Sequence, residues 1–131
     1  MATFQSILYL DDMRVPTVPG VAHVRSYDEF VEYLTNNPMP QLISFDHDLF
    51  TEHYPVAAEN RPGVRIPYEA YSEKTGLHCA RYIVETKLPL EYWISHSMNA
   101  QGNINIAEEL RRYCPEGELR GVRIPYRIPH C

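Results

Sequence analysis

Three short apolar runs, each ending in polar or ionisable residues, constrain the fold of this chain more than any other feature. A nearly continuous apolar run is typical of a strand covered on both faces, as in a parallel sheet. In open α/β sheets, ligands bind at the carboxyl ends of the strands, which is where these polar groups stand. The runs cover residues 7–10, 43–45 and 92–94, and they are followed by Asp11-Asp12, Asp46-His47-Asp48 and Ser95-His96-Ser97.

Helical patterns alternate with the strands along the chain. Ser26 with Glu29 three residues later is a capping-box pattern, which predicts a helix start. Residues 13–20 contain two prolines and a glycine, so a loop is expected there. Strands that alternate with helices indicate an α/β fold with a mostly parallel sheet. The expected strands cover 6–12, 21–25, 41–45 and 91–95, and the expected helices run from Ser26 to Asn36, from Thr75 to before Pro89 and from Asn103 to Tyr113.

The length and composition favour a single globular domain. The chain has 131 residues and a net charge of −5, which argues against an extended nucleic-acid surface but allows a small anionic ligand or one nucleic-acid end. No apolar run approaches the length of a membrane helix, and the N-terminus lacks a signal-peptide pattern. Three cysteines without CxxC spacing predict neither a disulfide framework nor a zinc site, and they favour a reducing, cytoplasmic location.

Four aspartates lie at the carboxyl ends of the first and third predicted strands. Asp11 and Asp12 are adjacent, whereas Asp46 and Asp48 are two apart and face the same way in extended chain. Carboxylates brought close together need a cation, and oxygen ligands select Mg²⁺ or Mn²⁺ over softer metals. The set therefore predicts a divalent-metal site, although a capping role is an equal alternative for any single aspartate.

Other polar residues at the same strand ends are candidates for catalysis and substrate binding. His47 and His96 are expected to transfer protons near neutral pH, with a structural role or metal ligation as the alternatives. Arg14 is predicted either to clamp a phosphate or to pair with a neighbouring aspartate. Ser97 and Asn99 are predicted to bind phosphoryl oxygens or to cap the next helix.

Two further features of the sequence are a long segment without an amphipathic period and a hexapeptide that occurs twice. Residues 50–75 are rich in proline and tyrosine and are expected to form either a lid over the site or a surface insertion. The hexapeptide Gly-Val-Arg-Ile-Pro-Tyr occurs at 63–68 and again at 121–126, within a C-terminal extension at about 115–131. Pairing of the two copies would hold the lid down, while chance similarity of two turns is the alternative.

Taken in order, these motifs resemble the cyclic-phosphate-processing receiver-like domains, divergent relatives of response-regulator receivers. The resemblance covers about residues 6–112 and implies a flavodoxin-type three-layer sandwich whose first crossover helix is reduced to a loop. It implies that Asp11 and Asp12 match the acidic metal pair and that Asp46 matches the phosphoacceptor position. Ser95 or Ser97 would match the hydroxyl residue that follows the fourth strand. No lysine ends a clear fifth strand, where the nearest bases are Arg123 and Arg127.

The resemblance also implies an activity. The leading hypothesis is a metal-assisted phosphohydrolase that opens cyclic phosphates, such as 2′,3′-cyclic ends of RNA, with His47 and His96 exchanging the proton. The alternative is a non-enzymatic receiver-like module that accepts phosphate on Asp46 or binds a partner protein. A third possibility is a protein that binds cyclic nucleotides without turnover.

Overall fold

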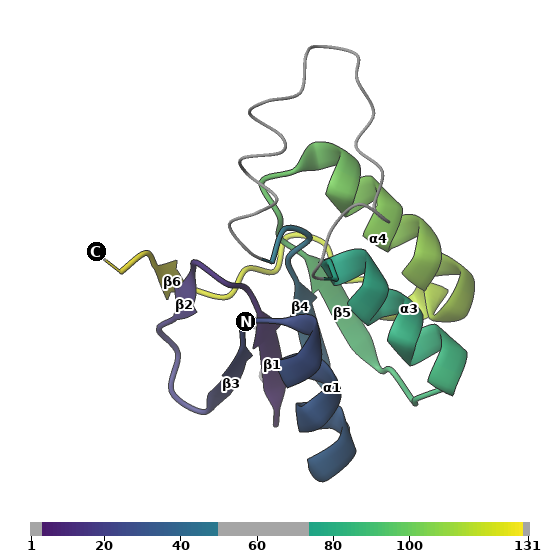
Figure 1. Ribbon diagram of the computed structural model, residues 1–131, viewed down its shortest axis with the longest axis horizontal. Coiled ribbons are helices and arrows are strands. Elements are labelled where there is room, and N and C mark those ends of the chain that lie inside the picture. Colours follow the sequence, from purple (N-terminus) through teal and green to yellow (C-terminus); the bar gives the residue numbers. More distant parts are fainter. Residues whose placement is uncertain (1–3, 50–73, 130–131) are drawn as a thin grey trace.

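A four-stranded parallel sheet forms the centre of the molecule in the computed structural model, which describes residues 4–49 and 74–129 (Figure 1). Its strands lie in the order β3-β1-β4-β5, and every neighbouring pair is parallel. This arrangement confirms the predicted receiver-like α/β fold with a mostly parallel sheet. Each strand is shorter by one to three residues than predicted. The strands are β1 (Ile7–Leu10), β3 (Val21–Val24), β4 (Leu42–Phe45) and β5 (Tyr92–Ser95).

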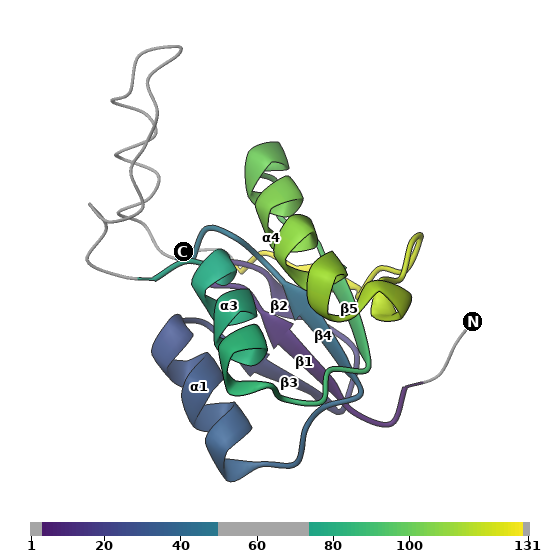
Figure 2. The ribbon, with the colours of Figure 1, turned by 90° about the vertical axis from the view of Figure 1, so that its right-hand side faces the viewer.

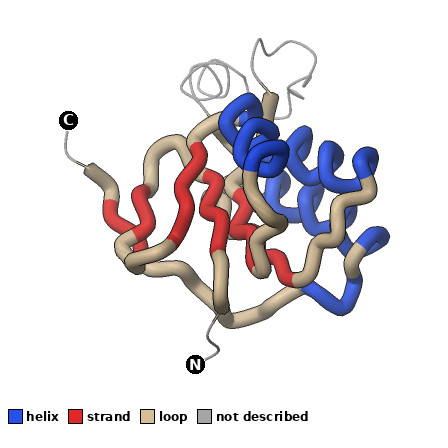
Figure 3. Tube along the Cα trace, turned by 90° about the horizontal axis from the view of Figure 1, so that it is seen from below, coloured by secondary structure: helices blue, strands red, loops and turns tan. Residues whose placement is uncertain are grey.

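Three helices cover one face of this sheet (Figures 2 and 3). Phe30 and Leu34 of α1, Ile83 of α3 and Leu110 of α4 belong to the main core together with the buried side chains of that face. None of the described helices is long and apolar enough to cross a membrane. The helices are α1 (Tyr27–Asn36), α3 (Gly76–Thr86) and α4 (Ala100–Tyr113).

The helix ends follow the expected cap residues with two differences. Ser26 accepts a hydrogen bond from the Glu29 amide, as predicted, but the Glu29 carboxylate accepts from the amide of Arg25 rather than from that of Ser26. Helix α4 begins three residues before the predicted start, because the Asn99 side chain caps it by accepting from the amide of Gly102.

Extended chain from the C-terminal region covers the opposite face of the sheet. After a short 3-10 turn, η2 (Pro115–Gly117), the amide of Leu119 donates to the Trp93 carbonyl at 3.1 Å, so the chain starts alongside β5. Val122 and Ile124 then pack in a second, smaller core with Tyr9 of β1. A three-layer sandwich would have helices on this face as well. Among the described residues, extended chain covers it instead.

A two-stranded antiparallel sheet ties the C-terminal region to the loop after β1. Its strands are β2 (Val15–Pro16) and β6 (Tyr126–Arg127). The predicted loop at 13–20 thus contains a short strand. Most of the predicted lid, at 50–73, and the first copy of the hexapeptide lie outside the described residues, so their suggested pairing stays a prediction.

Candidate functional site

Asp11, Asp46 and His96 each follow directly after a strand and lie in one row across the sheet. The residues one position earlier are neighbours in the sheet, where Leu10 is paired with Phe45 and Phe45 with Ser95. Backbone hydrogen bonds continue past the strand ends, since the amide of Asp46 donates to Leu10 and that of His96 donates to Phe45. Because side chains alternate along a strand, all three residues point to the sheet face that carries no helix.

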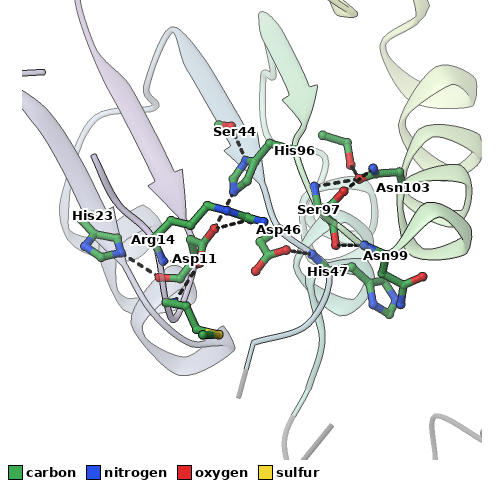
Figure 4. Close-up of polar contacts among 12 residues, drawn as sticks. Asp11, Arg14, His23, Ser44, Asp46, His47, His96, Ser97, Asn99 and Asn103 are labelled. Carbon is green, nitrogen blue, oxygen red and sulfur yellow. Dashed lines mark hydrogen bonds and ion pairs between the residues drawn. The ribbon is translucent and has the colours of Figure 1, made fainter. Parts of the chain in front are cut away.

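Asp11 is the most highly connected residue of the site (Figure 4). Its Oδ1 accepts hydrogen bonds from the amides of Met13 and Arg14, both at 2.8 Å. Its Oδ2 accepts from Arg14 Nη1 at 3.1 Å and lies 2.9 Å from His96 Nε2. Burial raises the pKa of Asp11, but the hydrogen bonds from His96 and the two amides outweigh it and hold the pKa below its usual range. Asp11 is therefore a carboxylate at neutral pH.

His96 is held in place on both ring nitrogens and on one ring face. Its Nδ1 lies 2.5 Å from Ser44 Oγ, while its Nε2 faces Asp11. The ring stacks on Tyr9, with centroids 4.5 Å apart. Burial lowers the pKa of His96 below its usual value, against the hydrogen bond and charge of Asp11. A neutral imidazole with a fixed orientation is thus placed at the end of β5.

Asp46 and Asp12 are acidic groups in an environment that disfavours their charge. Burial and the charge of Asp11 raise the pKa of Asp46 to about 8. The same two causes, burial and then the charge of Asp11, raise the pKa of Asp12 to about 6. The Oδ1 atom of Asp12 is buried and has no hydrogen-bond partner in the described part of the chain. A cation would stabilise both charged forms, which is the expected property of a metal site.

These observations fit a divalent-cation site. Ligand atoms of Asp11, Asp46 and His96 all lie within 4.8 Å of one another. Both nitrogens of His96 already face Asp11 and Ser44, so the carboxylate oxygens are the better ligands for a metal ion. Asp11 and Asp46 thus offer oxygen ligands of the kind that hard divalent cations prefer, whereas Asp12 does not belong to the group of ligand atoms within 4.8 Å.

His47 lies on the α4 side of Asp46 (Figure 4), and its side chain contacts that of Asp48. The His47 side chain is only 3 % exposed, and its Nδ1 lies 2.8 Å from Asp48 Oδ1, which also accepts from Asn99 Nδ2 at 3.4 Å. The ring packs against Gly102, where an added Cβ would lie 2.4 Å from His47 Cγ. The structure therefore brings His96, but not the ring of His47, into the group formed with Asp11 and Asp46.

Ser97 and Asn99 link the end of β5 to α4. The Ser97 hydroxyl accepts from the Asn99 amide at 3.0 Å and is hydrogen-bonded to Asp46. Asn103, a residue that the sequence did not single out, accepts from the Ser97 amide and from the Ser95 hydroxyl. The capping alternative is thus correct for Asn99, and Ser97 lies in contact with the site.

Comparison with known families agrees with this geometry. The model of the "Cyclic-phosphate processing Receiver domain" matches residues 6–112 of the chain. The chain belongs to this family. Searches of curated proteins and of solved structures found no match. Family membership associates this receiver domain with cyclic-phosphate processing and with a small phosphate substrate.

Two cavities adjoin the site of this receiver domain. The smaller has a volume of about 310 Å³ and is lined by Asp11, Asp46 and Asp48. The larger, of about 560 Å³, lies between the helix-free sheet face and the C-terminal segment and reaches His96. Arg14, Ser97, Met98 and Tyr126 line both, so the two cavities are neighbours.

Sequence reasoning missed three further residues that support Asp11 and His96. Ser44 lies in the middle of a buried strand, and its need for a hydrogen-bond partner is a signal that was present in the sequence. Tyr9 stacks on His96, and His23 Nε2 lies 2.7 Å from the Asp11 carbonyl oxygen. No signal along the chain marks these last two, because their role depends on the order of β3, β1, β4 and β5 in the sheet.

Proposed function

We propose that this receiver domain hydrolyses cyclic phosphodiesters, such as the 2′,3′-cyclic phosphate of a nucleotide or an RNA end. In this reaction, water adds to phosphorus, one of the two phosphorus–ribose oxygen bonds breaks, and the released ribose oxygen takes a proton. The observation that carries the proposal is the convergence of Asp11, Asp46 and His96 beside two adjoining cavities. Membership of the cyclic-phosphate-processing family supports the same substrate class.

A divalent cation, Mg²⁺ or Mn²⁺, would be held by Asp11, Asp46 and Asp12. When bound there, it would supply positive charge to the phosphoryl oxygens. The support for this donor set is the buried, unpartnered oxygen of Asp12 and the raised pKa of Asp46. Arg14 adds a second positive charge, since its guanidinium borders both cavities while it remains paired with Asp11.

His96 is assigned to protonate the leaving ribose oxygen. Its Nε2 faces a carboxylate oxygen of Asp11, which only accepts hydrogen bonds, so this nitrogen carries the proton. Nδ1 then accepts from the Ser44 hydroxyl, and the two contacts together fix the tautomer and the ring plane. As a neutral imidazole, His96 can take the proton that the attacking water loses and then, as an imidazolium, pass a proton to the released ribose oxygen, which is the proton transfer of general acid–base catalysis beside the substrate cavity.

The other predicted roles stay predictions within this proposal. His47 as a second proton-transfer group and Asp48 as a further metal ligand are less directly supported, because the two side chains contact each other. Ser97 as a substrate-binding residue is supported by its position on the wall of both cavities. For Asn99 the cap of α4 accounts for the side chain. The cytoplasmic location also stays a prediction.

The test is hydrolysis of nucleoside 2′,3′-cyclic phosphates by the full chain with Mn²⁺ or Mg²⁺, followed by ³¹P NMR. We expect Asp46→Asn and His96→Ala each to lower kcat/KM by at least about 100-fold, the usual scale for a group that transfers a proton or stabilises charge. Asp28→Asn is the matched control. Asp28 is exposed on α1, so this substitution removes the same charge at a position away from the site.

Three outcomes decide the proposal. Hydrolysis that disappears in both site variants but persists in Asp28→Asn supports it and excludes a contaminating phosphodiesterase. Hydrolysis that survives in His96→Ala contradicts the assigned proton transfer. A folded wild-type protein that converts no cyclic phosphate but is labelled by acetyl phosphate at Asp46 contradicts the enzyme and favours the signalling alternative.

A further inference from the structure

The larger cavity is a positively charged site in a negatively charged protein. The chain carries a net charge of −5, yet Arg14, Arg120 and Arg123 line this cavity. No aspartate or glutamate is among the described residues that line it. Arg14 is paired with Asp11 at 3.1 Å, so the charge left for a ligand comes mainly from Arg120 and Arg123. Guanidinium groups are the usual recognition elements for phosphate, which they bind with bidentate hydrogen bonds.

Two of these arginines have side chains available for a ligand. Arg123 has no hydrogen-bond or ion-pair partner among the described residues. Arg120 is 83 % exposed and has only a distant contact of 3.9 Å with Glu118. Glu118 is itself paired with Arg111 through two hydrogen bonds of 2.8 and 2.7 Å, so its charge is already neutralised.

The backbone sets the position of both arginines. Gly121, between them, has φ +76°, a left-handed conformation that other residues rarely adopt. The following Ile124 is buried against the helix-free face of the sheet. The arginines are therefore carried by an anchored turn, and ordering this segment does not add a large cost to ligand binding.

We propose that the larger cavity binds a second phosphate group of the substrate, with Arg120 and Arg123 as the residues that contact it. This inference rests on the proposed function, because the first phosphate is the cyclic one beside His96 and Asp46. The cavity of about 560 Å³ lies within the usual range for small-molecule sites and adjoins the acidic cavity, with which it shares Arg14 and Tyr126 as lining residues. The substrate is thus a nucleotide that carries both a cyclic phosphate and a 5′-phosphate or 5′-phosphodiester.

The binding test uses two ligands that differ only in this second phosphate. Adenosine 3′-monophosphate and adenosine 3′,5′-bisphosphate are titrated into the full chain by calorimetry. We expect the bisphosphate to bind about tenfold more tightly, as for one or two charge-assisted hydrogen bonds at an open site. In the double variant Arg120→Gln, Arg123→Gln this gain should fall below about twofold, with the affinity for the monophosphate unchanged.

Arg112→Gln is the matched control, since Arg112 is exposed on α4 and lines neither cavity. This variant should keep the tenfold gain. Circular dichroism and thermal melting check that the double variant is folded, which is expected because both substituted side chains are exposed. The inference is overturned if the wild-type protein binds both ligands equally, binds neither, or keeps its gain in the double variant.

The kinetic test separates this inference from the proposed function. Adenosine 2′,3′-cyclic phosphate is compared with the same nucleotide carrying a 5′-phosphate, and the ratio of kcat/KM should favour the second by about tenfold in wild type only. Hydrolysis of both substrates at equal rates would overturn the second-phosphate site and leave the phosphodiesterase intact. A bisphosphate preference in calorimetry without hydrolysis would overturn the phosphodiesterase and leave the second-phosphate site intact.

Discussion

Replacement of Asp46 by asparagine should change how the stability of the protein depends on pH. Burial, followed by the charge of Asp11, raises the pKa of Asp46 from 3.8 to about 8 in the folded protein. The side chain is buried and is hydrogen-bonded to the His47 amide and to Ser97. Between pH 4 and pH 8 the folded protein therefore holds a proton that the unfolded chain has released.

The sign follows from this difference in bound protons. Because the folded state binds more protons, raising the pH favours unfolding, and the stabilising contribution present below about pH 4 is lost as the pH rises through 8. The slope is about 1.4 kcal/mol per pH unit while Asp46 is protonated, and it flattens near pH 8. Between pH 6 and pH 8 the wild-type protein should lose about 2 kcal/mol of unfolding free energy. Asparagine does not titrate, so Asp46→Asn should not show this decrease in unfolding free energy.

The assay is urea unfolding in EDTA at pH 6, 7 and 8. The chain contains one tryptophan, Trp93, which is buried, so its fluorescence reports on the core. Asp28→Asn should follow the wild-type protein at every pH, because Asp28 is exposed. At pH 8, millimolar Mg²⁺ should restore stability to the wild type more than to Asp46→Asn. Equal pH dependence in wild type and Asp46→Asn would refute the reasoning that crowded, buried carboxylates form the site.

Three smaller predictions test the surroundings of the site. Gly102→Ala places a Cβ 2.4 Å from His47 Cγ, so urea unfolding should show a loss of about 1–3 kcal/mol despite the helix preference of alanine. Ser44→Ala removes the hydrogen-bond partner of His96 Nδ1 and should cost about 1 kcal/mol in the same assay. NMR titration should give His96 a pKa below its usual value, and Asp11→Asn should lower it further, because the Asp11 charge acts against burial.

Much of the fold was predictable because it depends on local patterns. The three apolar runs predicted β1, β4 and β5, the alternation of apolar and polar residues at 21–25 predicted β3, and Ser26 predicted the start of α1. The end of β1 was predicted two residues and that of β3 one residue too far along the chain, whereas the ends of β4 and β5 were predicted correctly. In β1 the reason is that Asp11 keeps one backbone hydrogen bond to the sheet but turns its side chain into the site. Local signals thus locate the polar residues but do not separate the last residue of a strand from the first residue of the site.

The contacts within the site depend on strand order, which no local pattern contains. Asp11 meets His96 across 85 residues of sequence because β1, β4 and β5 are neighbours in the sheet. His47 was grouped with His96 because both follow a strand, yet adjacent residues of an extended chain point to opposite sides. Asp46 therefore faces the same side as His96, while the ring of His47 lies toward α4.

The helix-free face of the sheet connects the fold to the proposed activity. Asp11, Asp46 and His96 point to this face, so a helix packed across it at that edge would occupy the space of the larger cavity. The loop after β1 takes the place of the first crossover helix, and the C-terminal segment covers the face instead. That segment is extended and leaves a cavity at the carboxyl edge, to which it contributes Arg120 and Arg123. Extended chain in place of a helix thus leaves the cavity open and also brings positive charge to it. A substrate with two phosphates would require such charge.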